Sequence, residues 1–426
     1  MSGINKMVEI LHRCLWVRNT ERPDEALFFN EDEHRIMPEL DLKVTYLLYG
    51  KRDADMLWRD KGYWAKFIYD PYAELGPVGE NEQGFPIFNT YAPPKWRHAN
   101  YFLGDLILPE HSIPTLIDRF LTHFTAEHAE SKEFLLDFLA TALRKRNGSY
   151  LCILSKTQGT GKGVLGEMCR TIFGDGNMRK VRGDTLNNRF NAAFLGRQFI
   201  MFDEFDFKNK ETLDRAKDLV NAELEIEKKG VDAFEISNTV NVYLATNRLE
   251  GLKEPGRRFS IPMTSDRPLK EFFSDEEIKR LQYDEKMIFK FARFLWWREV
   301  KRDMQVPFLS ERANEIREAN LSEWERLLCE EFFPCVPKGV FVPLESLQAF
   351  LKRKSGHGKA VPGRARMSEF AKKFPEFFVF DREANLEGIK EFGIRSIGEF
   401  TDFQPGLFCE ECRTIESFCT HSKRPK

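Results

Sequence analysis

Residues 150–163 read YLCILSKTQGTGKG, and the rest of the chain is arranged around this stretch. The run from Tyr150 to Leu154 is apolar and has the length of a buried strand. Residues 164–173 continue with helix-compatible spacing as far as Gly174, which is a typical helix stop. The stretch therefore predicts a strand, a glycine-rich loop and a helix, in that order.

The loop has the composition of a phosphate-binding loop. Glycines let backbone N–H groups close round phosphate oxygens, the helix N-terminus adds partial positive charge, and Lys162 can reach the terminal phosphates. Two positions depart from GxxxxGK[ST], since Lys156 replaces the first glycine and Gly163 replaces the magnesium-binding hydroxyl. The alternative is a glycine-rich surface turn before an ordinary helix. The predicted nucleotide contacts are Gln158, Gly159, Thr160, Gly161, Lys162, Gly163 and Val164.

The composition is that of a large globular protein. The chain has 426 residues, of which 42% are hydrophobic, and this is enough for a substantial core in about two to four domains. The net charge of -2 means that nucleic-acid contacts must come from local basic patches. No apolar run approaches the ~18 residues of a membrane span, so we expect a cytoplasmic protein without membrane contact. Eight scattered cysteines agree with a reducing compartment.

Acidic residues follow a second apolar run at residues 199–203. Phosphoryl transfer needs charge neutralisation and an oriented water, so we expect Asp203 to hold Mg²⁺ and Glu204 to polarise the attacking water. A third apolar run at residues 240–245 leads to Asn247, which is placed to sense the terminal phosphate because ligands of open α/β sheets lie beyond the carboxyl ends of strands. The alternatives are a solvated acidic turn and an Asn that starts a turn.

Two arginines, Arg257 and Arg258, follow a Pro-Gly turn. An arginine there can reach the nucleotide of a neighbouring subunit and stabilise transition-state charge, and Arg257 is the preferred candidate. The alternative is a surface strand with a salt bridge.

With these motifs in this order, the chain resembles the superfamily 3 helicases, and most closely the helicase portion of phage and mobile-element primase-helicases. KTQGTGKG resembles Walker A, FIMFDEF Walker B, ELEIEKKGVDAFEIS the B-prime segment, VYLATN motif C and GRRFSI the arginine-finger strand. The resemblance covers about residues 110–270 and extends more weakly to FNTYAPP, a connector seen before such motors. It implies ATP and Mg²⁺ as cofactors, a ring-forming homo-oligomer, usually a hexamer, and single-stranded DNA in the centre of the ring.

The resemblance also implies a basic hairpin that grips the strand. Lys228 and Lys229 are the nearest matches to its basic residues, although a Lys-Lys pair is more often a solvated face. Forked duplex and a primase or polymerase, fused or separate, are the further partners implied, in host cytoplasm if the protein is phage-encoded. The first hundred residues look too short for a complete primase domain. Asp53 and Asp55 have the spacing of some polymerase metal sites, but an exposed acidic turn is the favoured interpretation.

Helical and strand-like runs between residues 319 and 402 predict a winged-helix-like domain. Its basic residues are expected to contact DNA phosphates, and the alternatives are a solubilising face and a protein docking module. The predicted contacts are Lys352, Arg353, Lys354, Arg364 and Arg366.

Four zinc-compatible side chains lie near the C-terminus in the pattern C-x2-C-x6-C-x-H. The first half has the spacing of a zinc knuckle, whereas the second half is tighter than usual, so Zn²⁺ binding and free thiols both stay open. The residues are Cys409, Cys412, Cys419 and His421.

The predicted fold is α/β, with an AAA+-like P-loop ATPase core preceded by a helical bundle and followed by a winged-helix-like α+β domain. The predicted function is an ATP-dependent helicase that translocates on single-stranded DNA in phage or mobile-element replication. The alternatives are an ATP-driven initiator or DNA-remodelling factor without strand separation, and a nucleic-acid-binding protein with a decayed nucleotide site. The expected parts are a mixed segment at 1–108, the bundle at 109–148, the core at 149–270, a helical connector at 271–318, the winged helix at 319–402 and a Cys/His basic tail at 403–426.

Overall fold

The computed structural model divides the chain into two units, which are described separately. The first comprises residues 1–251 and 255–313, and the second comprises residues 252–254 and 314–426. No helix in the described part of the chain is long and apolar enough to cross a membrane. The described residues are 11, 13–21, 26–30, 35–37, 47, 52–53, 56, 62–82, 84–97, 110–187, 192–219, 221–228, 231–248, 250–252, 258–355, 361–374, 377–384, 390–398, 408–409 and 414–415.

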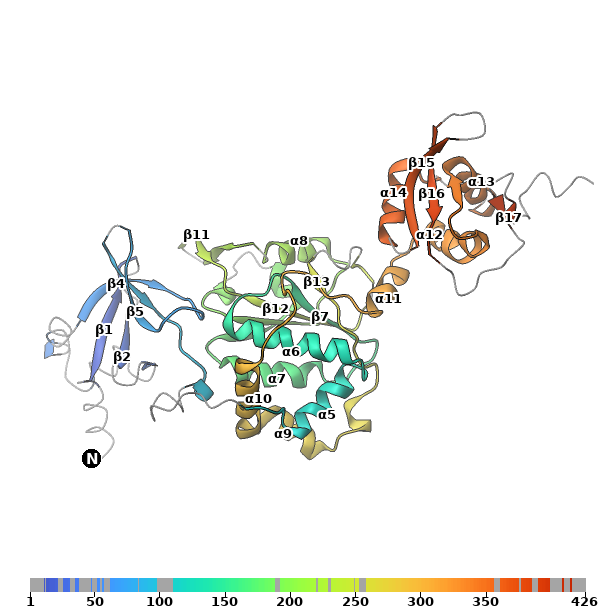
Figure 1. The fold of residues 1–426 in the computed structure, drawn as a ribbon. Helices are drawn as coiled ribbons and strands as arrows, with labels where there is room; N and C mark the ends of the chain where they lie inside the picture. Colours follow the sequence, from blue (N-terminus) through green and yellow to red (C-terminus); the bar gives the residue numbers. More distant parts are fainter. Residues whose placement is uncertain are drawn as a thin grey trace, which may run out of the picture. The chain divides into compact units, whose positions relative to one another are not determined.

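A five-stranded parallel sheet forms the centre of the first unit, in the order β13-β7-β12-β9-β8 (Figure 1). Strands β7 and β12 are buried along their whole length, which explains their continuous apolar sequence. Because all the strands are parallel, their carboxyl ends meet at one edge. The strands are β7 (Tyr150–Leu154), β8 (Met178–Arg182), β9 (Phe199–Asp203), β12 (Asn241–Thr246) and β13 (Phe259–Ser260).

Five helices lie on one side of this sheet in Figure 1, and their apolar residues share one core with it. Phe173, in the helix that follows the glycine-rich loop, stacks on Phe199 of β9 with ring centroids 4.5 Å apart. Two helices lie within the predicted bundle at 109–148, and both belong to this core. The helices are α5 (Thr115–Phe124), α6 (Ala129–Arg144), α7 (Lys162–Phe173), α9 (Asp275–Tyr283) and α10 (Glu285–Trp297).

Residues 278–300 differ from the single helix that their periodicity predicts. The helix is interrupted between α9 and α10 at Asp284, whose carboxylate accepts the Met287 N–H at 3.1 Å and so caps α10. Aspartate favours such N-cap positions because its side chain replaces a missing backbone acceptor. The sequence predicts heavy burial for Leu295, Trp296 and Trp297. Leu295 is buried and Trp296 is partly buried, with its ring 6.0 Å from that of Trp96, whereas Trp297 is 47% exposed and that prediction is wrong for it.

In addition to the central sheet and its helices, the first unit contains helix α8 (Lys210–Asp218). It also contains a hairpin of strands β10 (Glu223–Lys228) and β11 (Val231–Ser237). The hairpin strands pair antiparallel, with Lys228 opposite Val231. A hairpin therefore lies in the segment for which the resemblance implied one.

The N-terminal segment, whose fold the sequence did not predict, contains a six-stranded mixed sheet in the order β3-β2-β1-β4-β6-β5. The predicted connector is partly a strand of this sheet, β6, before it continues toward Trp96, whose indole N–H donates to the Ile172 carbonyl at 2.6 Å. The Tyr69 hydroxyl also donates to Asn177 at 2.9 Å, so polar contacts join this sheet to the central one. The strands are β1 (Cys14–Asn19), β2 (Ala26–Asn30), β3 (Arg35–Ile36), β4 (Gly62–Ile68), β5 (Gly76–Glu80) and β6 (Pro86–Asn89).

The second unit has helices and an antiparallel sheet in the order β14-β16-β15 around an aromatic core. The predicted helices and terminal hairpin are present, whereas the short strand β14 was not predicted. Two short strands, β17 (Phe408–Cys409) and β18 (Thr414–Ile415), follow. The larger elements are α11 (Arg312–Ala319), which begins in the first unit, α12 (Glu323–Leu327), β14 (Phe341–Pro343), α13 (Leu344–Ser355), α14 (Arg364–Lys373), β15 (Phe378–Ala384) and β16 (Lys390–Ser396).

Gly161 provides a test of how the loop is packed. Its φ of 110° lies in the left-handed region, and an added Cβ would come within 2.8 Å of the Phe120 ring. We expect Gly161→Ala to lower the free energy of unfolding by about 1–3 kcal/mol. Gly163→Ala is the matched control, because its Cβ would meet open space in a helix, and we expect no loss of stability. Urea denaturation compares the two, and equal losses would contradict this packing.

Candidate functional site

The loop between β7 and α7 is closed by its own side chains. The Ser155 hydroxyl lies 3.0 Å from that of Thr160 and donates to the Thr157 carbonyl at 3.1 Å. Both hydroxyl-bearing residues at the loop ends, Ser155 and Thr160, are buried. Gly159 and Gly161 adopt positive φ, which only glycine does at low cost. These contacts and conformations fix the shape of the loop.

The start of α7 supplies backbone donors beside this loop. The first intrahelical bond runs from the Leu165 N–H to the Gly161 carbonyl at 2.9 Å. The N–H groups of Lys162, Gly163 and Val164 therefore have no partner within the helix and carry its positive dipole end. The Val164 side chain is buried in the core, so only its backbone can serve a ligand, whereas Gln158 is exposed.

Lys162 joins the loop to a second strand end. Its ammonium donates to the side-chain oxygen of Asn247 at 2.5 Å, to the Thr157 carbonyl at 3.5 Å and to the Ser155 hydroxyl. Burial lowers the pKa of Lys162 to about 8, while the nearby carboxylates of Asp203 and Asp266 act in the opposite direction. The structure therefore brings Lys162, Asn247 and Asp203 together.

Asp203 ends β9, next to β12 in the sheet, and its carboxylate pairs with the Lys180 ammonium at 2.9 Å. Glu204 follows with a φ of 54°, rare for a residue with a side chain, and its side chain is exposed. Its carboxylate lies 3.6 Å from the Arg182 guanidinium. Two cations of β8 thus neutralise the two predicted catalytic acids.

The side chains near Lys162 can hold Mg²⁺ only together with phosphates and water. No group of three or more His, Cys, Asp or Glu side chains within the described residues could hold a metal ion alone. Mg²⁺ is commonly held by one or two carboxylates together with substrate phosphates and water, and Asp203 can supply such a carboxylate. Gly163 supplies no hydroxyl, although the space beside it is open.

A cluster of charged residues around the buried Arg312 was not predicted from the sequence. The Asp266 carboxylate accepts the Lys156 N–H at 2.6 Å and pairs with Arg312 at 3.0 Å. Arg312 is 2% exposed and also donates to the Thr264 carbonyl at 2.6 Å. Lys156, at the position where the motif usually has glycine, is thus anchored through its backbone. No motif signals this cluster, because its members lie far apart in the sequence.

Of the two arginine-finger candidates, Arg258 lies away from the Lys162 site. Arg257 is outside the described residues. The Arg258 carbonyl accepts the Tyr150 N–H at 2.8 Å, at the start of β7, whereas Lys162 follows the end of that strand. A five-residue strand spans about 16 Å, so the Arg258 backbone is at the opposite edge of the sheet from the Lys162 site. The structure does not bring Arg258 to Lys162 within one chain.

The predicted nucleic-acid contacts are placed in part. The Lys228 side chain and Lys229 are outside the described residues. In the described part of the hairpin, Glu225 lies opposite Glu235, and both are exposed, so this face is acidic. The zinc candidates Cys412, Cys419 and His421, and the Cys409 side chain, also lie outside the described residues.

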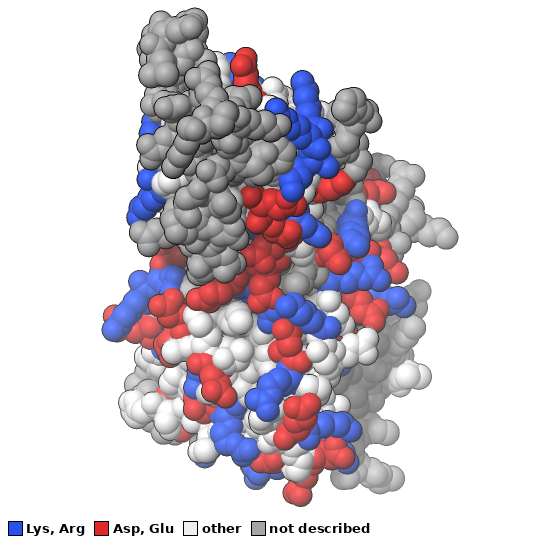
Figure 2. Space-filling model, turned by 90° about the vertical axis from the view of Figure 1, so that its right-hand side faces the viewer, with Lys and Arg blue, Asp and Glu red and all other residues white. Residues whose placement is uncertain are grey.

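The five basic residues predicted to contact DNA in the second unit are exposed, and some of them have partners within the chain. Lys354 pairs with Glu331, and the Arg364 guanidinium lies 3.4 Å from the centre of the Phe392 ring. Both signs of charge occur side by side on the face in Figure 2. Contacts to an anionic polymer must therefore be local. The other exposed candidates are Lys352, Arg353 and Arg366.

Comparisons with known proteins support the fold. Residues 153–258 match a family described as a family of unknown function (DUF5906). No curated protein matches the chain. The chain is similar to the apo structure of the NrS-1 C terminal region (305-718), with a TM-score of 0.62 and 16% identity over 92% of this chain and 98% of that chain. The A form apo structure of that region gives a TM-score of 0.62 and 14% identity over 93% and 99%. At this identity the likeness shows a shared fold alone.

The Asp266 cluster predicts a stability difference. Asp266→Ala removes an acceptor shared by the Lys156 N–H and the buried Arg312, so we expect the free energy of unfolding to fall by about 1–3 kcal/mol. Asp175→Ala is the control, because Asp175 forms an exposed pair with Arg170 at 3.9 Å and should change stability by less than about 0.5 kcal/mol. Urea denaturation of both variants measures the difference. Indistinguishable midpoints would show that the cluster does not stabilise the loop.

Proposed function

We propose that the chain is an ATP-dependent, ring-forming helicase that translocates on single-stranded DNA during phage or mobile-element replication. The observation that carries the proposal is the convergence of Lys162, Asn247 and Asp203 at the carboxyl edge of the parallel sheet. These residues follow or end three adjacent strands, β7, β12 and β9. Ligands of open α/β sheets lie at this edge.

The sheet supports a P-loop core of the AAA+ type. In the chain order of the five strands, the sheet reads 5-1-4-3-2, with the loop strand β7 beside the Asn247 strand β12. This order resembles that of AAA+ motors. The glycine-rich loop and the N-terminal end of α7 fit a triphosphate, whose charge the backbone donors and Lys162 would neutralise. The missing hydroxyl at Gly163 leaves Asp203 as the predicted protein ligand of Mg²⁺.

Each residue has a defined part in hydrolysis. Lys162 exchanges Asn247 for phosphate oxygens, which releases the Asn247 side chain to orient the attacking water. Asp203, which pairs with Lys180 in the structure, would hold Mg²⁺, and the ion would supply charge neutralisation at the phosphates. Glu204 accepts a proton from the water as general base. The protein itself therefore supplies the charged groups that hydrolysis requires.

Arg258 supports action between subunits. The Arg258 backbone lies at the opposite edge of the sheet from Lys162 of the same chain. An arginine finger at this position would therefore serve the nucleotide of a neighbouring copy. In such a ring, the nucleotide lies at the seam between copies. Arg257 has the same proposed role.

The acidic hairpin favours a second candidate function. A strand gripped along the hairpin would face Glu225 and Glu235, so contact is limited to the hairpin end, where Lys228 and Lys229 occur in the sequence. A remodelling factor that binds duplex DNA through its second unit would need no such grip. Strand-separation assays on a forked duplex distinguish the two functions.

ATP turnover tests the catalytic assignment. We expect Glu204→Gln to bind nucleotide like the wild type but to hydrolyse it about 100- to 10,000-fold more slowly, because the general base is lost. Lys162→Ala should lose both binding and turnover. Glu299→Gln is the control for an exposed glutamate outside the site and should behave as the wild type. Equal low turnover in the wild type and both site variants, with and without single-stranded DNA, would instead indicate a binding protein with a decayed site.

The lowered pKa of Lys162 predicts a pH dependence of nucleotide affinity. A pKa of about 8 leaves the side chain mostly charged at pH 7 and mostly neutral at pH 9. We expect the affinity for an ATP analogue to fall about tenfold between these values, because phosphate binding requires the charged form. Calorimetric titrations measure it, and Lys162→Arg should show no such fall because its guanidinium stays charged. A wild-type affinity that does not change with pH would contradict the assignment.

A further inference from the structure

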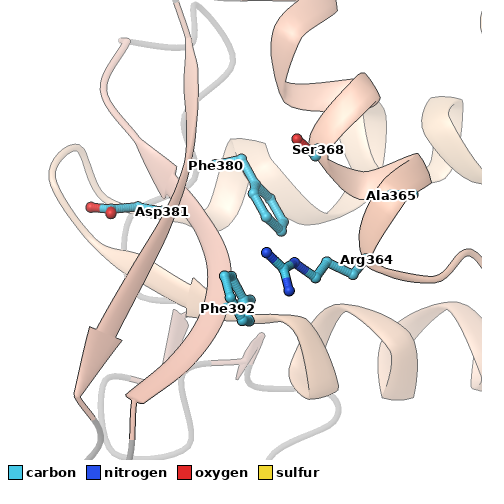
Figure 3. Close-up of a pocket in the computed structure, with 6 residues that line it drawn as sticks. All are labelled: Arg364, Ala365, Ser368, Phe380, Asp381 and Phe392. Carbon is cyan, nitrogen blue, oxygen red and sulfur yellow. The ribbon is translucent and has the colours of Figure 1, made fainter.

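A pocket of about 480 Å³ lies in the second unit, between the start of α14 and the hairpin of β15 and β16 (Figure 3). Its size falls within the range of small-ligand sites. None of the ATP-site residues contributes to it. The lining residues are Arg364, Ala365, Ser368, Phe380, Asp381 and Phe392.

Two aromatic rings form one wall of the pocket. Phe380 lies opposite Ile394 in the hairpin register, and Phe392 is two residues before Ile394, so all three share one face of the sheet. The Phe380 and Phe392 rings are nearly parallel, with an interplanar angle of 10° and centroids 6.0 Å apart. Ile394 is fully buried, whereas the two rings are only partly buried. The aromatic face therefore continues past the core and into the pocket.

A cation completes this wall. The guanidinium of Arg364, the first residue of α14, lies over Phe392 at 3.4 Å from the ring centre. In Figure 3 the Arg364, Phe380 and Phe392 side chains point toward one another, whereas the Asp381 carboxylate points away. The Asp381 carboxylate lies 3.6 Å from the Arg395 guanidinium. The charge that faces the rings is thus positive.

Flat aromatic surfaces with a planar cation match the chemistry of a nucleobase. Bases of single strands stack on aromatic rings and on arginine, while bases in a duplex have no free face. Ser368 lies one helical turn after Arg364 and brings a hydroxyl that can bond to a base edge. Lys372, one turn beyond Ser368 on the same side of the helix, is exposed and can contact an adjoining phosphate.

We propose that this pocket binds an unstacked base of a single-stranded nucleic acid. The inference rests on the proposed nucleic-acid partner of the chain but not on ATP hydrolysis. It assigns a base-stacking site to the second unit, beside the phosphate contacts predicted from its basic residues. A strand held there is anchored outside the ATP-driven unit.

Photo-cross-linking tests the site directly. The full chain, without nucleotide, is irradiated with an oligo-dT strand that carries one 5-iododeoxyuridine, and the adduct is mapped by mass spectrometry. We expect an adduct on Phe380 or Phe392, and we expect it to persist in Lys162→Ala, where the proposed ATP site is disabled. Adducts confined to the first unit, or an equal adduct yield with a blunt duplex, would overturn the proposal. A wild-type chain that forms this adduct but shows no ATP turnover would count against the proposed motor alone.

Affinity measurements separate stacking from charge. We expect Phe392→Ala to weaken binding of oligo-dT at least about fivefold and Phe392→Tyr to restore it, since base stacking depends on the ring. Val379→Ala is the control, because Val379 is exposed on the other face of β15, and it should bind as the wild type. A strand of abasic sites should bind the wild type and Phe392→Ala equally.

Two outcomes of the same titrations would contradict the assignment. The first is unchanged oligo-dT affinity in Phe392→Ala when its unfolding midpoint matches that of the wild type. The second is displacement of the strand from the pocket by thymidine monophosphate at concentrations near the strand's Kd, which would identify a free nucleotide as the ligand.

Discussion

One constraint links the sheet to its edge: a charged lysine is held, partly buried, where three parallel strands end. Lys162 loses hydration there, and its pKa falls, so the site compensates with the Asn247 oxygen, the Ser155 hydroxyl and the Asp203 carboxylate nearby. Such a group of polar partners can form only if β7, β12 and β9 are adjacent and parallel. The sheet order and the chemistry of its edge are therefore linked. Phosphates entering the site would replace these internal partners with stronger ones.

The central sheet and its helices were largely predictable, because buried parallel strands give continuous apolar runs and the covering helices give a regular period. Those apolar runs also predicted which polar residues end or follow the strands, namely Lys162, Asp203 and Asn247. The Asp266–Arg312 pair did not, because neither residue is part of a local pattern. The N-terminal sheet was not predictable either, since strands such as β5, with the sequence GPVGE, give no apolar run. A single capping residue, Asp284, was enough to split a predicted helix.

The two units divide the proposed work by their chemistry. The first unit carries the parallel sheet and the phosphate-facing edge, whereas its described hairpin face is acidic and unsuited to a DNA backbone. The second unit carries exposed lysine and arginine residues on α13 and α14, together with an aromatic pocket. Hydrolysis and strand anchoring thus depend on separate residues, and variants can disable them independently. The shared fold with the NrS-1 C terminal region extends over both units.

The most direct measurement is an experimental structure of the protein with Mg²⁺ and a non-hydrolysable ATP analogue. The account predicts the γ-phosphate within hydrogen-bond distance of the Lys162 ammonium and the Asn247 side chain, Mg²⁺ in place of Lys180 beside Asp203, and Arg257 or Arg258 of an adjoining copy at the nucleotide. A nucleotide bound elsewhere, or Lys162 still bonded to Asn247 with the analogue present at saturation, would contradict it.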